Sequence, residues 1–344
     1  MALDPKAQNY YPQERVVQAR SLALRSPIPA RVGNIRFGSA SWTDPTLVKS
    51  RLFYPPSARS PEARLRYYCG RFSLVEVDAP YYALPTRRQA TLWRDRSPPG
   101  FVFNIKAFSS VTYHATCLDR LPKDLQESLS GRLAGRRSAR HEELGGTLDA
   151  ELLRRFVLAI EPLRSAGKLG AILLQFPPSF EATRGNVRKL IHRREQLSGF
   201  PLAVEFRHRS WLEACRWERV LEVLREHNLS YVGVDSPRHC PTALPGRAVV
   251  TNPKLAMLRF HGRNQGAWSG PAASAAERFD YLYTEEELDE WVKPIQRLSK
   301  EAEQVHVVMN NCTYDAAQLS GYGMATLLQE AYSAREARKT QVTT

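Results

Sequence analysis

Short apolar runs with the composition of β-strands recur along the chain, and helical patterns lie between most of them. The runs cover residues 34–39, 74–78, 101–106, 171–175, 202–207, 231–235, 257–261 and 305–310. Helices are predicted at residues 12–24, 61–71, 86–96, 148–165, 186–197, 217–227, 284–299 and 316–334. Eight strands that alternate with helices are the arrangement of a (β/α)₈ barrel. We therefore predict an α/β fold, a TIM-like barrel.

The remaining segments predict one barrel domain with additions. Residues 1–33 form an N-terminal extension, residues 34–335 the barrel, and residues 336–344 a C-terminal tail. A long insertion, residues 109–147, follows the third strand, and residues 262–280 form a long loop after the seventh. Two helix starts carry capping signals: Ser60 before Pro61, and Thr284 three positions before Glu287.

Polar residues interrupt several strands at every second position, and alternate side chains of a barrel strand face its interior. This alternation directs the following side chains inward: Glu76, Asp78, Asn104, Lys106, Glu205, Arg207, Arg259 and His261. Buried charges must be neutralised by one another or by a ligand. One interpretation is therefore a structural ion-pair network, and the other is a binding site at the C-terminal ends of the strands.

The residue types at the strand ends suggest distinct roles. The catalytic candidates are Glu76 and Glu205 for acid/base work or metal ligation, Lys106 as an electrophile, an anion anchor or an amine nucleophile, and His261 for proton transfer. The ligand-binding candidates are Arg207, Arg259 and Arg263 for phosphate or carboxylate, His208, Asn310 and Asn311 for hydrogen bonds, and Tyr81, Trp42 and Trp211 for a sugar ring or nucleobase. The alternatives are a hydrogen-bonded structural role for His208 and His261, a solvated loop position for Arg263, and packing beneath a loop for each aromatic residue.

Charge and cysteine usage narrow the class of protein. The net charge of +14 suggests an acidic partner, a small anion or nucleic acid, although the arginine excess could also reflect compositional bias. Five scattered cysteines without CxxC spacing are typical of a reduced, cytoplasmic protein.

No run is long and apolar enough for a membrane span or signal peptide. Since GxGxxG, P-loop, HExxH and GxSxG motifs are absent, we predict no nucleotide cofactor, while a divalent metal is possible and its ligands are unknown.

Seven motifs in order resemble the signatures of the YecE-like family, the domain of unknown function 72. They are FGSASW (37–42), FYPP (53–56), VEVDAPYYALP (75–85), FNIKAF (103–108), VEFRHRSW (204–211), LRFHGRN (258–264) and MNN (309–311). The resemblance runs from about residue 35 to about residue 330 and implies a TIM barrel with a polar pocket at its C-terminal mouth, without an established reaction. Two motifs depart from the pattern of the family. Before the aromatic pair, where Asn or Ser is common, this chain reads Asp78-Ala79-Pro80, and Cys312 stands where many members have His or Asn.

Three hypotheses of function follow. In the first, the pocket binds or acts on a small anionic or sugar-like molecule, as a hydrolase, isomerase or lyase would. In the second, the chain is a metal-dependent, endonuclease-like barrel that acts on nucleic acid. In the third, the same pocket binds a ligand without turnover.

Overall fold

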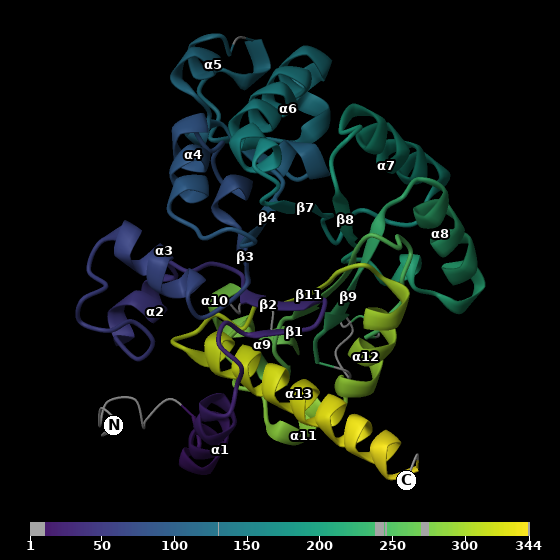
Figure 1. Cartoon of the computed structure of the whole chain (residues 1–344). Coiled ribbons are helices and arrows are strands. Elements are labelled where there is room, and N and C mark those ends of the chain that lie inside the picture. Colours follow the sequence, from purple (N-terminus) through teal and green to yellow (C-terminus); the bar gives the residue numbers. More distant parts are fainter. Residues whose placement is uncertain (1–10, 130, 238–243, 245, 270–274, 343–344) are drawn as a thin grey trace. The chain divides into compact units, whose positions relative to one another are not determined.

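The structure is a computed structural model that describes residues 11–129, 131–237, 244, 246–269 and 275–342. The chain forms two compact units. Figure 1 labels their helices and strands. The terminal unit comprises Met1–Val75 and Tyr231–Thr344, and the central unit comprises Glu76–Ser230. Each unit is described by itself below.

The strands of the terminal unit lie in the order β1-β2-β11-β10-β9. Their bounds are β1 Arg31–Val32, β2 Ile35–Ser39, β9 Ser230–Asp235, β10 Ala256–Phe260 and β11 Val305–Met309. β1 pairs with β2 in antiparallel orientation, and the other ladders are parallel. β9, β10 and β11 are buried along their whole length, as expected for parallel strands covered on both faces.

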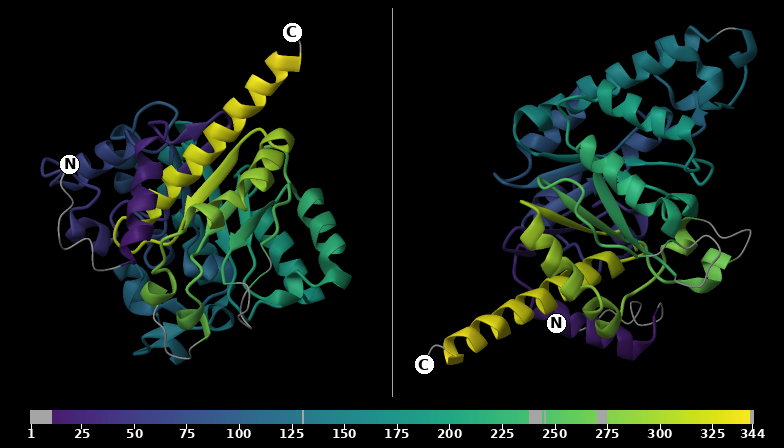
Figure 2. Two further views of the ribbon diagram at one scale, coloured as in Figure 1. Left: turned by 90° about the horizontal axis from the view of Figure 1, so that it is seen from below. Right: turned by 90° about the vertical axis from the view of Figure 1, so that its right-hand side faces the viewer.

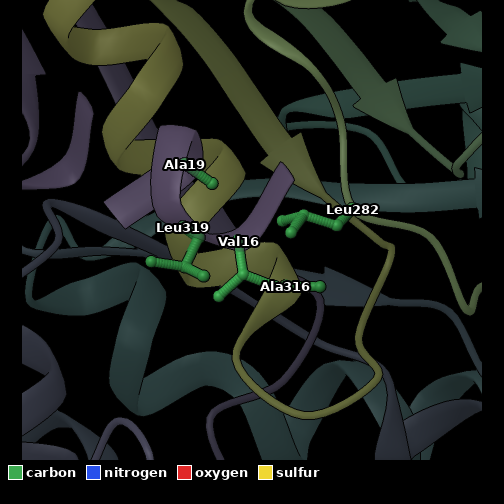
Figure 3. Packing of buried hydrophobic residues seen from close by; sticks show 5 residues of the cluster. All are labelled: Val16, Ala19, Leu282, Ala316 and Leu319. Carbon is green, nitrogen blue, oxygen red and sulfur yellow. The ribbon is translucent and has the colours of Figure 1, made fainter. Parts of the chain in front are cut away.

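The helices of the terminal unit are α1 Gln13–Leu24, α2 Pro45–Ser50, α3 Pro61–Cys69, α9 Gln265–Ser269, α10 Ala275–Arg278, α11 Glu285–Asp289, α12 Val292–Glu301 and α13 Ala316–Val342. Helix α1 confirms the predicted helix in the N-terminal extension. Figure 2 shows α1 beside the first part of α13. Apolar side chains join the two helices (Figure 3): Val16 and Ala19 pack with Leu282, Ala316 and Leu319. The extension is thereby anchored to its own unit.

Helix α13 is the longest helix among the described residues and runs to Val342, into residues 336–344, which the sequence analysis assigns to a C-terminal tail. Its first part is buried, and residues 333–337 are exposed. Within the described ranges, no helix combines the length and the apolar composition needed to cross a bilayer.

The central unit contains three parallel strands, β4 Val102–Lys106, β7 Leu169–Gln175 and β8 Leu202–Glu205, paired in that order. β3, Leu74–Val77, spans the boundary between the units. The insertion after β4 contains a small antiparallel pair, β5 Thr116–Cys117 and β6 Ser138–Ala139. The helices are α4 Arg87–Asp95, α5 Lys123–Glu127, α6 His141–Ser165, α7 Arg184–Gln196 and α8 Ala214–Glu226.

All eight predicted runs form strands, so the α/β class is confirmed. Two predictions of local structure are wrong. The predicted helix 284–299 is divided into α11 and α12, and Pro294 lies in the first turn of α12. Proline is tolerated there but breaks a helix interior, because it lacks an N–H and its ring clashes with the preceding turn. The predicted loop 262–280 contains α9 and α10.

Within the terminal unit, β2 lies against the first residue of β3. A Cβ built on Gly38 would be 2.0 Å from the carbonyl oxygen of Leu74, so only glycine fits there. The hydroxyl of Tyr68 accepts a hydrogen bond from the Ser39 N–H (2.7 Å) and donates to the same Leu74 carbonyl (3.2 Å). Tyr68 thus satisfies backbone groups of both strands at this junction. Closure of all eight strands into one barrel stays a prediction.

Candidate functional site

An ion pair lies at the end of β8 in the central unit. Arg207 donates from Nη1 to Oε1 of Glu205 across 3.1 Å. The Glu205 side chain is fully buried, whereas that of Arg207 is 17% exposed. Because the two residues are two positions apart, both side chains lie on the same side of the extended chain. A buried carboxylate therefore orients a cation that reaches solvent.

A lysine and two aromatic rings lie close together in the same unit. Lys106, the last residue of β4, places Nζ 4.3 Å from the ring centre of Tyr81, within the range of a cation–π interaction. Tyr81 belongs to the 3₁₀ turn that follows β3, and burial raises its pKa to about 12. The ring of His114 meets Tyr81 edge-on, with 5.0 Å between the ring centres.

His114 is a site residue that the sequence analysis missed. Its Nδ1 lies 2.9 Å from Oγ1 of Thr112. Burial, together with the positive charges of Lys106 and Arg207, lowers its pKa to about 4. His114 is therefore neutral near pH 7, in a region of positive potential. We call Glu205, Arg207, Lys106, Tyr81 and His114 the strand-end cluster.

Glu76 also lies in the central unit, where its side chain in β3 is completely buried. Asn104, which the sequence analysis directs inward together with Lys106, is buried in β4. A buried carboxylate is costly unless it is neutralised or hydrogen-bonded, so Glu76 stays a candidate for either an acid/base or a structural role.

The segment after Arg207 is held by local contacts. His208 Nδ1 lies 2.7 Å from Oγ of Ser210 and accepts a hydrogen bond from the Ser210 N–H. Trp211 is buried, donates its indole N–H to the Phe180 carbonyl (2.6 Å), and stacks on Phe206 with 4.1 Å between ring centres. These contacts favour a turn-capping role for His208 and a packing role for Trp211.

In the terminal unit, Asn310 connects Arg259 with His261. Oδ1 of Asn310 accepts from Nη2 of Arg259 (3.4 Å), and Nδ2 lies 2.7 Å from Nδ1 of His261. Because a guanidinium only donates, it fixes the amide oxygen of Asn310 toward Arg259. The amide nitrogen then donates to His261, so Nδ1 is the acceptor and the neutral ring carries its proton on Nε2. His261 is completely buried.

Arg263 is surrounded by carboxylates. It donates to Asp235 from Nη2 (2.8 Å) and Nε, and to Glu290 (2.9 Å). Burial opposes its charge, but these hydrogen bonds raise its pKa. Asp235 also accepts from the hydroxyl of Tyr283 (2.6 Å) and the indole of Trp291 (3.0 Å). The arrangement favours a structural role for Arg263 over binding of an anion.

Trp42 and Asn311 are both buried in the terminal unit. The backbone carbonyl of Trp42 accepts a hydrogen bond from the Tyr54 hydroxyl. Asn311 donates from Nδ2 to the Tyr281 carbonyl (2.8 Å) and to Ser320 Oγ (3.1 Å). The Asn311 contacts connect the residue after β11 to neighbouring segments, and burial of the two side chains favours packing roles for both. Among the residues that the structure describes, no group of three or more His, Cys, Asp or Glu side chains is placed to hold a metal.

The chain matches the family model described as "Protein of unknown function DUF72" over residues 36–343. It belongs to this family. UPF0759 protein YunF of Bacillus subtilis is 28% identical over 302 residues, which are 87% of this chain and 96% of that protein. The DUF72 family is the YecE-like family that the motifs indicate.

Solved structures of two family members are similar to this chain. The DUF72 family protein EF0366 of Enterococcus faecalis is 27% identical, with a TM-score of 0.70 over 86% of this chain and 95% of that one. The DUF72 family protein TM1631 of Thermotoga maritima is 30% identical, with a TM-score of 0.67 over 86% of this chain and 99% of that one. These similarities support the α/β fold, and none of the descriptions names an activity.

Proposed function

We propose that the strand-end cluster binds a small anionic molecule, and that the chain is an enzyme or binding protein for such a ligand. One observation carries the proposal: burial, and then the positive charges of Lys106 and Arg207, lower the pKa of the half-buried His114 ring to about 4. Two cations that disfavour a third positive charge create the potential that attracts an anion.

Each residue of the strand-end cluster has a different proposed role in binding. The exposed part of Arg207 offers a planar fork for phosphate or carboxylate, and Glu205 holds that fork in place. Lys106, held over the ring of Tyr81, adds a second positive charge. His114 is neutral and supplies a hydrogen-bonding group without further charge. If the bound molecule is a substrate, Glu76 and Glu205 are the proposed acid/base residues.

We also propose that the eight strands close into a (β/α)₈ barrel. The alternation of strands and helices, the parallel ladders within each unit and the close approach of Gly38 to Leu74 support closure. A cytoplasmic location is supported by the cysteines, since Cys69, Cys117, Cys215 and Cys312 are all free thiols.

Phosphate is the probe that tests the anion site. Phosphate at ten times its dissociation constant should stabilise the folded protein by about 1.4 kcal/mol, because it binds only the folded state. Thermal unfolding is measured in phosphate and in chloride at equal ionic strength. Arg207→Met and Lys106→Met should lose most of this stabilisation, whereas Arg219→Met, at a position whose side chain is 80% exposed, should retain it.

Equal stabilisation of all four proteins by phosphate would contradict the proposal. The net charge of +14 keeps nucleic acid as a second candidate. An oligonucleotide that binds the parent more tightly than phosphate, and that binds Arg207→Met weakly, would favour this candidate over a small anion.

A further inference from the structure

A second candidate site is a pocket of about 550 Å³ built entirely from residues of the terminal unit. Its lining includes Tyr11, Arg263, Asn264, Asp280, Tyr281 and Glu287. Ligand pockets commonly have volumes of roughly 300–1,000 Å³ and a few well-placed polar groups. The size and the lining therefore suit a small polar molecule.

The N-terminal extension contributes Tyr11 to the lining of this pocket. The hydroxyl of Tyr11 donates to Oδ1 of Asp280 across 2.5 Å. Helix α1 holds Tyr11 in place, since Arg15 donates to the Leu282 carbonyl (2.9 Å) and Arg20 pairs with Asp315 (2.9 Å). The buried apolar contacts between α1 and α13 add to this anchoring (Figure 3).

The matched family region begins at residue 36, so Tyr11 and α1 lie before it. Among the described residues, Tyr11 is therefore the one lining residue of this pocket that the matched family region does not encode. Any ligand selectivity that depends on Tyr11 therefore comes from the N-terminal extension and not from the matched family region.

The charge balance of the lining disfavours an anion. Arg263 is already paired with Asp235 and Glu290. The lining also contains two carboxylates, Asp280 and Glu287. A phosphate or carboxylate ligand would meet this negative charge without an uncompensated cation.

Hydroxyl groups fit the same lining well. Glu287 already accepts from the Tyr281 hydroxyl (2.5 Å) and the Thr284 N–H (3.0 Å), so the carboxylates are held as oriented acceptors. The hydroxyls of Tyr11 and Tyr281 already donate to Asp280 and Glu287, so their oxygens, like the carboxylates, are acceptors for a ligand hydroxyl. The side-chain amide of Asn264 is held by backbone groups and shapes the lining. We propose that this pocket binds an uncharged, hydroxyl-rich molecule of the sugar class.

Ligand-observed saturation-transfer NMR on the full chain tests the proposal, with D-glucose, maltose and myo-inositol as probes. At least one probe should bind. Asp280→Asn keeps the shape of the side chain but removes its charge, and should weaken binding at least about tenfold, since hydrogen bonds to charged groups are the stronger ones. Tyr11→Phe should weaken it too. Asp289→Asn, an exposed carboxylate-to-amide change nearby in α11, should leave binding unchanged.

Thermal unfolding establishes whether each variant is folded. If Asp280→Asn does not fold, Tyr11→Phe still tests the proposal. Failure of all three probes to bind would overturn the proposal, as would unchanged binding by both lining variants. Glucose 6-phosphate that binds more tightly than glucose, or spermidine that binds while sugars do not, would overturn the assigned ligand class. Arg207→Met should not alter sugar binding. A failure of the sugar-pocket proposal can therefore be distinguished from a failure of the anion-site proposal.

Discussion

Arg193 in the central unit offers a sharp test of how buried charge stabilises the fold. Its side chain is 1% exposed and donates to Asp149 Oδ2 (2.6 Å), to Gln196 Oε1 (2.7 Å) and to the backbone carbonyls of Val111 and Ser110. Arg193→Met keeps an unbranched apolar chain but removes every donor. Since Oδ1 of Asp149 has no hydrogen-bond partner among the described residues, the carboxylate would be left without its donor. We expect a loss of about 3–5 kcal/mol, the cost of removing one partner of a buried pair.

The free energy of unfolding is obtained from urea denaturation followed by circular dichroism. Arg188→Met is the matched control, because Arg188 lies on the same helix, α7, and is exposed. Its effect should stay within about 0.5 kcal/mol, as for most surface substitutions. A loss below about 1 kcal/mol for Arg193→Met, or equal losses for the two variants, would refute the reasoning.

Two further predictions concern the candidate carboxylate and a buried histidine. Glu205→Gln should lower the free energy of unfolding by only about 1 kcal/mol, because the amide oxygen can still accept a hydrogen bond from Arg207. The difference is measured by urea denaturation. A loss of several kcal/mol would indicate a structural ion pair. Burial, with the charge of Arg36, lowers the pKa of His306 to about 3. The unfolded chain therefore takes up this proton below about pH 6.5 while the folded chain does not, so stability should fall by up to about 1.4 kcal/mol per pH unit from about 6.5 down to about 3. His306→Gln should reduce that slope, and an unchanged slope would show that His306 does not cause it.

The strands could be predicted from the sequence because each is a continuous apolar run, and buried parallel strands have that composition. Two helix starts were predictable from local chemistry. Ser60 Oγ accepts from the Ala63 N–H (3.0 Å), and Thr284 and Glu287 form the expected capping box. These contacts span three residues, so the local sequence contains all the information.

The division between α11 and α12 was missed because amphipathic periodicity continues through it. The local signal was Pro294, which fits the first turn of a helix and not its interior. Trp291, just before α12, donates to Asp235, 56 residues earlier. A hydrogen bond between residues so distant in sequence leaves no trace in the periodicity.

In the candidate sites too, contacts between residues far apart in sequence could not be predicted. Alternation along one strand correctly suggested that Glu205 and Arg207 lie on the same face, and they form an ion pair. The sequence analysis did not single out His114, because its proximity to Lys106 and Arg207 depends on the path of the insertion. Nor did it reveal the pairing of Arg263 with Glu290, 27 residues away. Spacing within an element predicts a contact, whereas spacing across a long loop does not.

The pKa of His114, followed by NMR with and without phosphate, tests the proposed anion site most directly. Lys106→Met should raise this pKa from about 4, because one of the two cations that lower it is removed. Lys123→Met, an exposed lysine in the insertion, should leave it unchanged. Saturating phosphate should raise the pKa of His114 in the parent protein, because the bound anion offsets the charges of Lys106 and Arg207. A pKa of His114 that phosphate leaves unchanged would contradict the proposed anion site.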